Sequence, residues 1–401
     1  MSWFVLGSFA AWWVVVLLAV SLRSRAYAMF RGVQLAVHTL IAIAIVPAFG
    51  ALFPLFLYLH GLVYFQAIAL VRPKLRPLWY RALFSIPAAF FGAGTLLALP
   101  WAVAARLGWS LPLVWLPYVV ALLGVIQSLT VREEQVDVVV ADGNVQGLRR
   151  HVSGAERVAR PLRIVQLTDP HLGPFMSVER LRSIALSAVR RRPDLVLLTG
   201  DFLTMESQAD PLELGAALEP LRALPGRVFA CLGNHDHEAP ETVRRALEHA
   251  GVKLLVDAAA VVQTEAGAVQ LVGANFVFRG RAEHLQRLCA AEPRVAGALR
   301  LLLLHDPSAF RHVPEGEADL VLSGHTHGGQ VGLVSLGLPW TLMRLFVNAP
   351  DHGLWARGYD RLYVHRGTGH YGFPLRIGVP AENSLLCVHA PTCAPSSTAP
   401  R

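Results

Sequence analysis

The first 130 residues contain no Asp or Glu and consist mainly of long apolar runs. A helix needs about 20 apolar residues to cross the hydrocarbon part of a bilayer, and residues 3–22 meet that length. Residues 32–71 form a longer uncharged run, interrupted by Pro47, Gly50 and Pro54, so we expect two helices joined by a tight turn near residues 49–53. Residues 82–105 and 107–129 are the fourth and fifth expected spans. The sequence therefore predicts an N-terminal α-helical transmembrane domain over residues 1–130.

The first span resembles a signal peptide because Ala26-Tyr27-Ala28 could be a cleavage site. No Lys or Arg precedes the apolar run, however, and Arg23 and Arg25 separate it from that site. We therefore expect an uncleaved anchor. His38 and His60 lie inside apolar runs, where ionisable groups invite a functional interpretation. We favour neutral imidazoles that face a neighbouring helix.

The excess of basic residues belongs entirely to this first part of the chain. The whole chain has 36 Lys and Arg against 28 Asp and Glu, a formal net charge of +8, and eight of the basic residues lie within residues 1–130. They occupy loops between apolar runs, where they orient helices, so the charge does not indicate nucleic-acid binding. If residues 32–71 cross twice, the basic loops 23–31 and 72–81 share one side. The expected protein is then an integral membrane protein of the bacterial inner-membrane type, with everything after residue 129 in the cytoplasm.

From residue 131 onward, short apolar runs alternate with amphipathic stretches, which predicts an α/β domain over residues 131–390. We expect helix caps at Ser177 and Asp210 and a helix from Pro240 to Gly251. Residues 391–401 are rich in Pro, Ser, Thr and Ala and predict a disordered tail. The four cysteines form no zinc pattern and no disulfide framework, and Cys231 is expected to be buried. Nine strands are expected, over residues 136–140, 163–168, 194–199, 227–232, 269–273, 300–305, 319–323, 361–365 and 384–389.

Metal-binding side chains follow five of these strands, where each strand ends. Buried strands fix position closely, and the loops after them stay open to a substrate, so donors from separate strand ends can converge. Asp, Asn and His donors without a thiolate suit manganese, iron or zinc about equally. In this number they predict two divalent metal ions held side by side, although the last motif alone would also fit a mononuclear zinc site. The motifs are Asp169-Pro170-His171, Gly200-Asp201, Gly233-Asn234-His235-Asp236, His305-Asp306 and Gly324-His325-Thr326-His327.

The ordered set resembles the calcineurin-like metallophosphoesterase superfamily, over roughly residues 163–389. Residues 319–330, residues 362–369 and the run Pro374-Leu375-Arg376 are similar to the bacterial membrane-associated branch, which includes phosphodiesterases and UDP-diacylglucosamine hydrolase-like enzymes. The resemblance implies a four-layer α/β/β/α sandwich. It also implies that the protein hydrolyses phosphodiester or pyrophosphate bonds with a hydroxide that two metal ions activate. Because the protein is expected in a membrane, its substrate could be lipid-linked.

The resemblance assigns each residue a role. Asp169, His171 and His327 would hold one ion, Asn234, His305 and His325 the other, and Asp201 would bridge them. His235 would be a non-ligand acid or a donor to the phosphoryl oxygens. His305 is preferred over His249, His284 and His312 because it ends an apolar strand.

Two departures from the family pattern bear on the substrate. Phe202-Leu203-Thr204 replaces the Asp-Arg-Gly of protein serine/threonine phosphatases, which argues against that substrate class. His370-Tyr371-Gly372 replaces the small residues of the membrane-associated branch. Two other functional classes remain open: a multi-span sensor or transport protein with a regulatory phosphoesterase domain, and a non-catalytic scaffold. A scaffold would have lost ligands, and none is missing.

Overall fold

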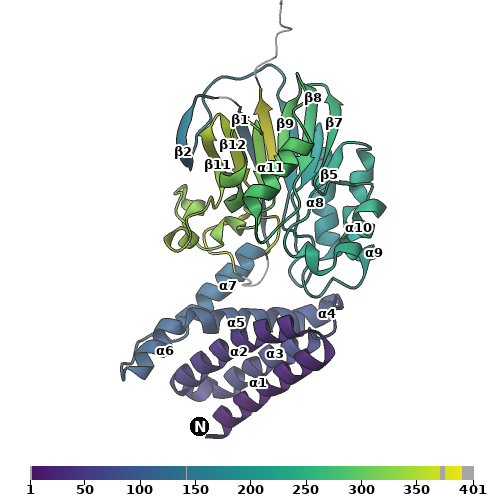
Figure 1. Ribbon diagram of the computed structural model, residues 1–401. Coiled ribbons are helices and arrows are strands. Elements are labelled where there is room, and N and C mark those ends of the chain that lie inside the picture. The colour runs from purple at the N-terminus through teal and green to yellow at the C-terminus, as the bar shows by residue number, and fades with distance from the viewer. Residues whose placement is uncertain (1, 141, 371–374, 391–401) are drawn as a thin grey trace, which may run out of the picture.

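The computed structural model describes residues 2–140, 142–370 and 375–390. A bundle of apolar helices, formed by residues 2–128, lies on one side of an α/β domain that begins at β1, and α7 leads from one to the other (Figure 1). The expected tail over residues 391–401 lies outside the described residues.

The bundle contains three helical stretches that are long and apolar enough to cross a membrane: Ser2–Leu22, Arg25–Ala69 and Leu78–Leu97. The 45-residue stretch is a helical hairpin with its turn at the expected place. The Tyr27 hydroxyl donates to the carbonyl of Ala67 at 3.1 Å, and the rings of His38 and His60 are in hydrogen-bond contact at 3.1 Å, so the two arms run antiparallel. The helices are α1 (Ser2–Leu22), α2 (Arg25–Ile45), η1 (Val46–Leu52), α3 (Phe53–Ala69), α4 (Leu78–Tyr80), η2 (Arg81–Ser85), α5 (Ile86–Leu97), α6 (Leu99–Arg106) and α7 (Leu116–Ser128).

The last two expected spans have different bounds from those expected, because the sequence carries helix breakers: a span-length stretch covers Leu78–Leu97, and the last helix is shorter than a span. The run over residues 82–105 splits between α5 and α6 just before Pro100, which stands in the first turn of α6. The run over residues 107–129 forms a helix of only 13 residues, α7, preceded by Gly108 and Pro112. Gly124 of α7 packs against Leu375, and the Gln127 side chain accepts a hydrogen bond from Gly378 N at 2.7 Å. This helix therefore joins the bundle to the α/β domain.

The α/β domain consists of two sheets packed face to face. The first has the strand order β1-β13-β3-β4-β5-β6 and the second β2-β11-β12-β10-β9-β8-β7. The first comprises β1 (Val131–Val139), β13 (Ala381–His389), β3 (Leu162–Leu167), β4 (Leu195–Leu198), β5 (Val228–Ala230) and β6 (Lys253–Leu254). The second comprises β2 (Val145–Arg150), β11 (Gly353–Gly358), β12 (Asp360–Val364), β10 (Leu320–Ser323), β9 (Leu299–Leu303), β8 (Gly267–Gly273) and β7 (Ala258–Thr264).

Three hydrophobic layers separate the four structural layers. One core lies between the sheets, a second lies under α8 (Val178–Arg190), α9 (Pro211–Leu218) and α10 (Pro240–His249), and a third lies under α11 (Arg281–Ala291). This is the expected α/β/β/α sandwich. Strands β3, β4 and β5 run parallel, as do β8, β9, β10 and β12. Their carboxyl ends carry the loops that hold the motifs.

The helix caps expected from the sequence form hydrogen bonds in the structure. The Ser177 hydroxyl accepts from Arg180 N at 3.1 Å and the Asp210 carboxylate from Leu212 N at 2.8 Å, so both expected caps form. Cys231 is fully buried, as expected.

Candidate metal centre

The structure brings all seven predicted ligands together at the carboxyl ends of β3, β4, β5, β9 and β10. Asp169, His171 and His327 form one group, in which one ligand atom from each side chain lies within 4.8 Å of the others. Asp201, His305 and His325 form a second group of the same kind. The loops of both sheets therefore contribute to one site.

Asp201 of the second group also lies close to the first. One of its carboxylate oxygens, Oδ2, lies 3.2 Å from His305 Nε2 and 3.7 Å from His171 Nε2. Asn234 completes the second group, since its Oδ1 is 3.3 Å from His305 Nε2. In the first group, His327 Nε2 lies 3.4 Å from Asp169 Oδ1. These are the positions that a bridging carboxylate and two flanking sets of donors would occupy.

Hydrogen bonds behind the imidazoles fix their orientation. Nδ1 of His305 lies 2.6 Å from the carbonyl oxygen of Thr199, and Nδ1 of His171 lies 3.3 Å from that of Leu203. A histidine that donates one ring nitrogen to a carbonyl presents the other nitrogen as a ligand, which is the usual arrangement around bound metals. Both rings therefore direct Nε2 toward the site.

The loops that carry the ligands adopt strained backbone conformations. Non-glycine residues seldom have a positive φ, and such strain clusters at functional sites. Here the ligand loops are held by the parallel strands before them. The candidate ligands with a positive φ are Asp169 (51°), His171 (46°), Asp201 (57°), His325 (67°) and His327 (51°).

Electrostatics favour cations in the site. Burial lowers the pKa of His171 to about 3 and that of His325 to about 4, so these imidazoles are neutral and able to bind metal. Burial also lowers the pKa of His305, but the charge and hydrogen bond of Asp201, the charge of Asp169 and the hydrogen bond to Thr199 together raise that pKa to about 10. A buried carboxylate that recruits a proton onto a neighbouring imidazole marks a place where positive charge is stabilised.

Comparison with known proteins identifies the family. The calcineurin-like phosphoesterase family matches residues 162–329. Phosphodiesterase YaeI of Escherichia coli is 31% identical over 238 residues, which cover 57% of this chain and 82% of YaeI. The chain belongs to the calcineurin-like phosphoesterase family. It is therefore a hydrolase of phosphoester bonds, and the α/β domain is its phosphoesterase domain.

Two further relatives have the same kind of domain. A protein of Danio rerio described as a transmembrane protein with metallophosphoesterase domain is 30% identical over 240 residues, which cover 55% of this chain and 52% of that protein. The uncharacterised metallophosphoesterase YkuE of Bacillus subtilis is 27% identical over 221 residues, which cover 54% of this chain and 74% of YkuE. In each case the similarity extends over little more than half of this chain.

Asp236 positions the phosphoesterase loops, a role that sequence reasoning did not assign to it. Its Oδ2 accepts from the backbone N–H groups of Asp201 and Gly233, and its Oδ1 from that of Phe202, each at 2.8 Å. One buried carboxylate thus ties the loop after β4 to the loop after β5. Gly233 has to be glycine because a Cβ there would collide with Asp201.

His235 is held beside the metal-binding side chains by a partner that the sequence did not reveal. Its Nδ1 lies 2.8 Å from Oε1 of Glu238, and its ring centroid is 5.6 Å from that of His171. Burial lowers the pKa of His235, but the hydrogen bond that its ring donates to Glu238 and the charges of Asp201 and Glu238 together outweigh burial, and the pKa is raised. The only sequence signal for Glu238 was its position three residues after His235.

Arg376 closes the other side of the site and was also missed as a functional residue. It is completely buried, and its guanidinium donates to the carbonyls of Arg366 at 2.7 Å and His327 at 3.2 Å. It therefore fixes the segment that carries His327. It belongs to the Pro374-Leu375-Arg376 run that resembles the membrane-associated branch, and that resemblance was its only signal.

Proposed function

We propose that the protein is a membrane-anchored phosphodiesterase or pyrophosphatase that depends on two divalent metal ions. The observation that carries this proposal is the convergence of two groups of three ligands, each within 4.8 Å. The donors are imidazoles, carboxylates and one amide oxygen, which suit manganese, iron or zinc. When bound, such a pair of ions activates water for attack and neutralises charge on the phosphoryl oxygens.

The ligands divide between the two ions as the geometry suggests. Asp169, His171 and His327 would hold the first ion, and Asn234, His305 and His325 the second, with Asp201 shared between them. His235 has no place in either group of three. Since Glu238 holds its Nδ1 and favours the protonated ring, His235 would donate a proton or a hydrogen bond to the leaving oxygen.

Residues 1–130 would anchor this domain in a bilayer. The loop that links α1 to α2 contacts the phosphoesterase domain, because the Arg23 guanidinium donates to the Gln208 side chain at 3.0 Å. Arg81 likewise donates to the carbonyl of Gly173 at 3.4 Å. The basic segments 23–31 and 72–81 therefore lie near the catalytic side, which under the positive-inside rule is cytoplasmic. Residues 333–347 support membrane contact as well: Phe346 is 80% exposed and Trp340 63% exposed.

A lipid-linked phosphodiester or pyrophosphate is the substrate class we propose. The bundle holds the site at the bilayer, and the chain resembles a branch that includes hydrolases of nucleotide-linked lipids. The buried histidines of the bundle favour an anchor over a transporter. His38 and His60 stack on each other with ring centroids 5.2 Å apart, so they have the helix-packing role expected of neutral imidazoles.

A turnover assay tests the proposal. The full-length protein, stripped of metal and supplied with manganese, iron or zinc, should hydrolyse an aryl phosphodiester. Asp201→Ala should lose bound metal and turnover together. The loss in each should exceed the roughly 10–100-fold loss that follows when a residue hydrogen-bonded to a metal ligand is removed. Asp210→Ala removes only an exposed helix cap and should keep both. Wild-type metal content and turnover in Asp201→Ala, or no turnover with any of the three metals, would refute the proposal.

A further inference from the structure

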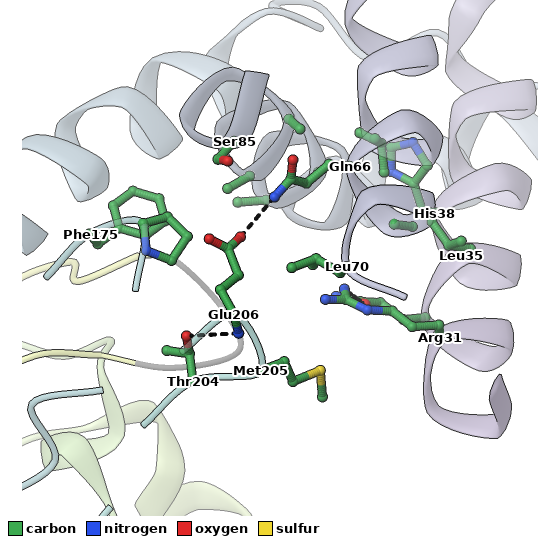
Figure 2. A pocket seen from close by; sticks show the side chains of 18 of the residues that line it. Arg31, Leu35, His38, Gln66, Leu70, Ser85, Phe175, Thr204, Met205 and Glu206 are labelled. Carbon is green, nitrogen blue, oxygen red and sulfur yellow. Dashed lines mark hydrogen bonds between the residues drawn. The ribbon is translucent and has the colours of Figure 1, made fainter. Parts of the chain in front are cut away.

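A cavity of about 170 Å³ lies between the helical bundle and the phosphoesterase domain (Figure 2). Its walls come from α2, α3 and α5 on one side and from the loops after β3 and β4 on the other. His171, a predicted metal ligand, lines it, and so do His38 and Leu96 from within the bundle. The cavity thus connects the metal centre to the interior of the apolar helices.

Most of the cavity wall is apolar, and one side of it is made of small residues. Ala88, Ala89, Gly92 and Ala93 of α5 all line the cavity. A Cβ built at Gly92 would meet nothing within 4 Å, so the space next to this helix is open. Apolar clefts with a few placed polar groups are typical of sites for small molecules with apolar parts.

Two polar groups that line the cavity, Glu206 and Ser85, each have an oxygen to which no described residue hydrogen-bonds. Glu206 is only 3% exposed, and its Oε1 accepts a hydrogen bond from the Gln66 amide of α3 at 2.8 Å. No described residue forms a hydrogen bond with its Oε2, nor with the Ser85 hydroxyl. Figure 2 shows the Glu206 carboxylate inside the cavity, between Gln66 and Phe175.

A buried acceptor without a partner costs stability, so such groups often mark the place of a ligand. Burial raises the pKa of Glu206 to about 7, which leaves its carboxyl group able either to accept or to donate a hydrogen bond near neutral pH. Both properties fit a polar group of a ligand, such as a hydroxyl or an amide.

We propose that this cavity holds the hydrocarbon chain of a lipid phosphoester substrate, and that Glu206 hydrogen-bonds to a hydroxyl or amide next to that chain. The proposal rests on the proposed function, because the phosphoester would lie at the metal centre beside His171. The hydrocarbon chain enters the bundle between α2, α3 and α5 instead of remaining in the bilayer. The apolar helices would then form part of the substrate site as well as an anchor.

Chain length tests the cavity. The full-length protein in phosphatidylcholine nanodiscs is assayed with 4-nitrophenyl ethyl phosphate and 4-nitrophenyl octyl phosphate. The octyl diester should have at least about a ten-fold higher kcat/KM, because each buried methylene adds to binding. Gly92→Phe fills the open space on α5 and should abolish that preference. Gly61→Phe is the matched control, since Gly61 also faces open space on an apolar helix but does not line the cavity, and it should keep the preference.

A hydroxylated probe tests Glu206. The wild-type protein should have a higher kcat/KM for a 2-hydroxyoctyl diester than for the octyl diester. Glu206→Met keeps the length of the side chain but cannot hydrogen-bond in the same way. This variant should lose the preference for the hydroxylated diester and keep the preference for octyl over ethyl.

The outcomes separate the two proposals. Hydrolysis of the ethyl and octyl diesters with equal kcat/KM would overturn the hydrocarbon site and leave the phosphodiesterase intact. If Gly92→Phe lowered kcat/KM equally for both diesters, the cavity would hold a structural lipid or the variant would have a packing defect. Either result would also overturn the hydrocarbon site. No hydrolysis of either diester by the wild-type protein, with any of the three metals, would refute the proposed function itself.

Discussion

His235 is the residue whose chemistry differs most from that of its neighbours. It follows a predicted ligand directly in the sequence, yet its ring belongs to neither group of three and its Nδ1 is paired with Glu238. Its backbone N–H donates to Oδ1 of Asp201 at 2.9 Å, so its backbone is held at the site even without its ring. Loss of the ring should therefore leave the ligands in place.

His235→Ala should keep the wild-type metal content and lose about 10²–10⁴-fold in kcat, because it removes an acid and not a ligand. Metal analysis of the purified variant gives its metal content, and turnover of an aryl diester gives its kcat. His312→Ala replaces an exposed histidine and should change neither. A His235→Ala enzyme with the wild-type kcat, or one that has lost its metal, would contradict the assigned role.

The convergence of the seven candidate ligands was predictable because each follows an apolar strand, and the ends of neighbouring parallel strands lie at the same edge of a sheet. The contacts behind them were not predictable in the same way. Asp236 acts through three backbone N–H groups from two separate loops, and Arg376 acts through carbonyls brought near it by folding. Such roles depend on tertiary proximity, which no local pattern in the sequence encodes.

At the scale of elements, β13 joins the edge of one sheet to the loops of the site. Glu382 of β13 is buried, and its carboxylate lies 2.8 Å from the Arg366 guanidinium and accepts from the Tyr363 hydroxyl at 3.1 Å. Burial raises the pKa of Glu382, but the charge of Arg366, the charge of His365 and the hydrogen bonds from Arg366 and Tyr363 together hold the pKa below its usual value, at about 2. The pair therefore stabilises the fold near the loop that begins at Arg366.

Glu382→Gln should lower the free energy of unfolding at pH 7 by about 3 kcal/mol, because it removes the fully buried carboxylate that pairs with Arg366 and leaves only the more exposed Glu134 as a charged partner among the described residues. The lowered pKa of Glu382 determines how the free energy of unfolding changes with pH. The stabilisation is present above the ordinary glutamate pKa of 4.5 and is lost as the pH falls below it. Chemical denaturation at pH 7 and at lower pH measures this. The wild-type protein should lose stability on acidification more steeply than the variant, and parallel curves would contradict the assignment.

Nine of the strands were predictable from apolar runs with turns at their ends, and four were not. Strand β6 has only two residues, and β7 is an edge strand that begins with three alanines. Strand β1 extends further back than expected, through Arg132, Glu133 and Glu134, because this edge strand is partly exposed and can carry charge. Short or exposed strands have too few apolar residues to produce a signal.

For the whole molecule, apolar composition alone predicted helices longer than those in the structure. Residues 107–129 have the composition of a span, but the helix within them has 13 residues and packs on the phosphoesterase domain through Gly124 and Gln127. An apolar helix surface can be covered by protein as well as by lipid, and composition does not distinguish the two. The hairpin of α2 and α3 was predictable because Pro47, Gly50 and Pro54 interrupt the run at its middle.

The arrangement of the helices makes a prediction about sidedness. The Arg23 guanidinium donates to the carbonyl of Leu70, so the ends of α1 and α3 lie together, and Arg23 also contacts Gln208 of the phosphoesterase domain. The turn over residues 46–52 lies at the other end of the α2–α3 hairpin. If the basic loops face the cytoplasm, this turn faces the opposite side of the membrane.

Single cysteines test this arrangement in a variant that carries Cys393→Ser. The three cysteines that the structure describes are buried, so an impermeant maleimide should not reach them. Ala51→Cys in the exposed turn should be labelled in intact spheroplasts. Val152→Cys, at a position 88% exposed in the phosphoesterase domain, should be labelled only after lysis. The reverse pattern would place the catalytic domain outside the cytoplasm, and labelling of both cysteines in intact spheroplasts would mean that the bundle does not separate them by a membrane.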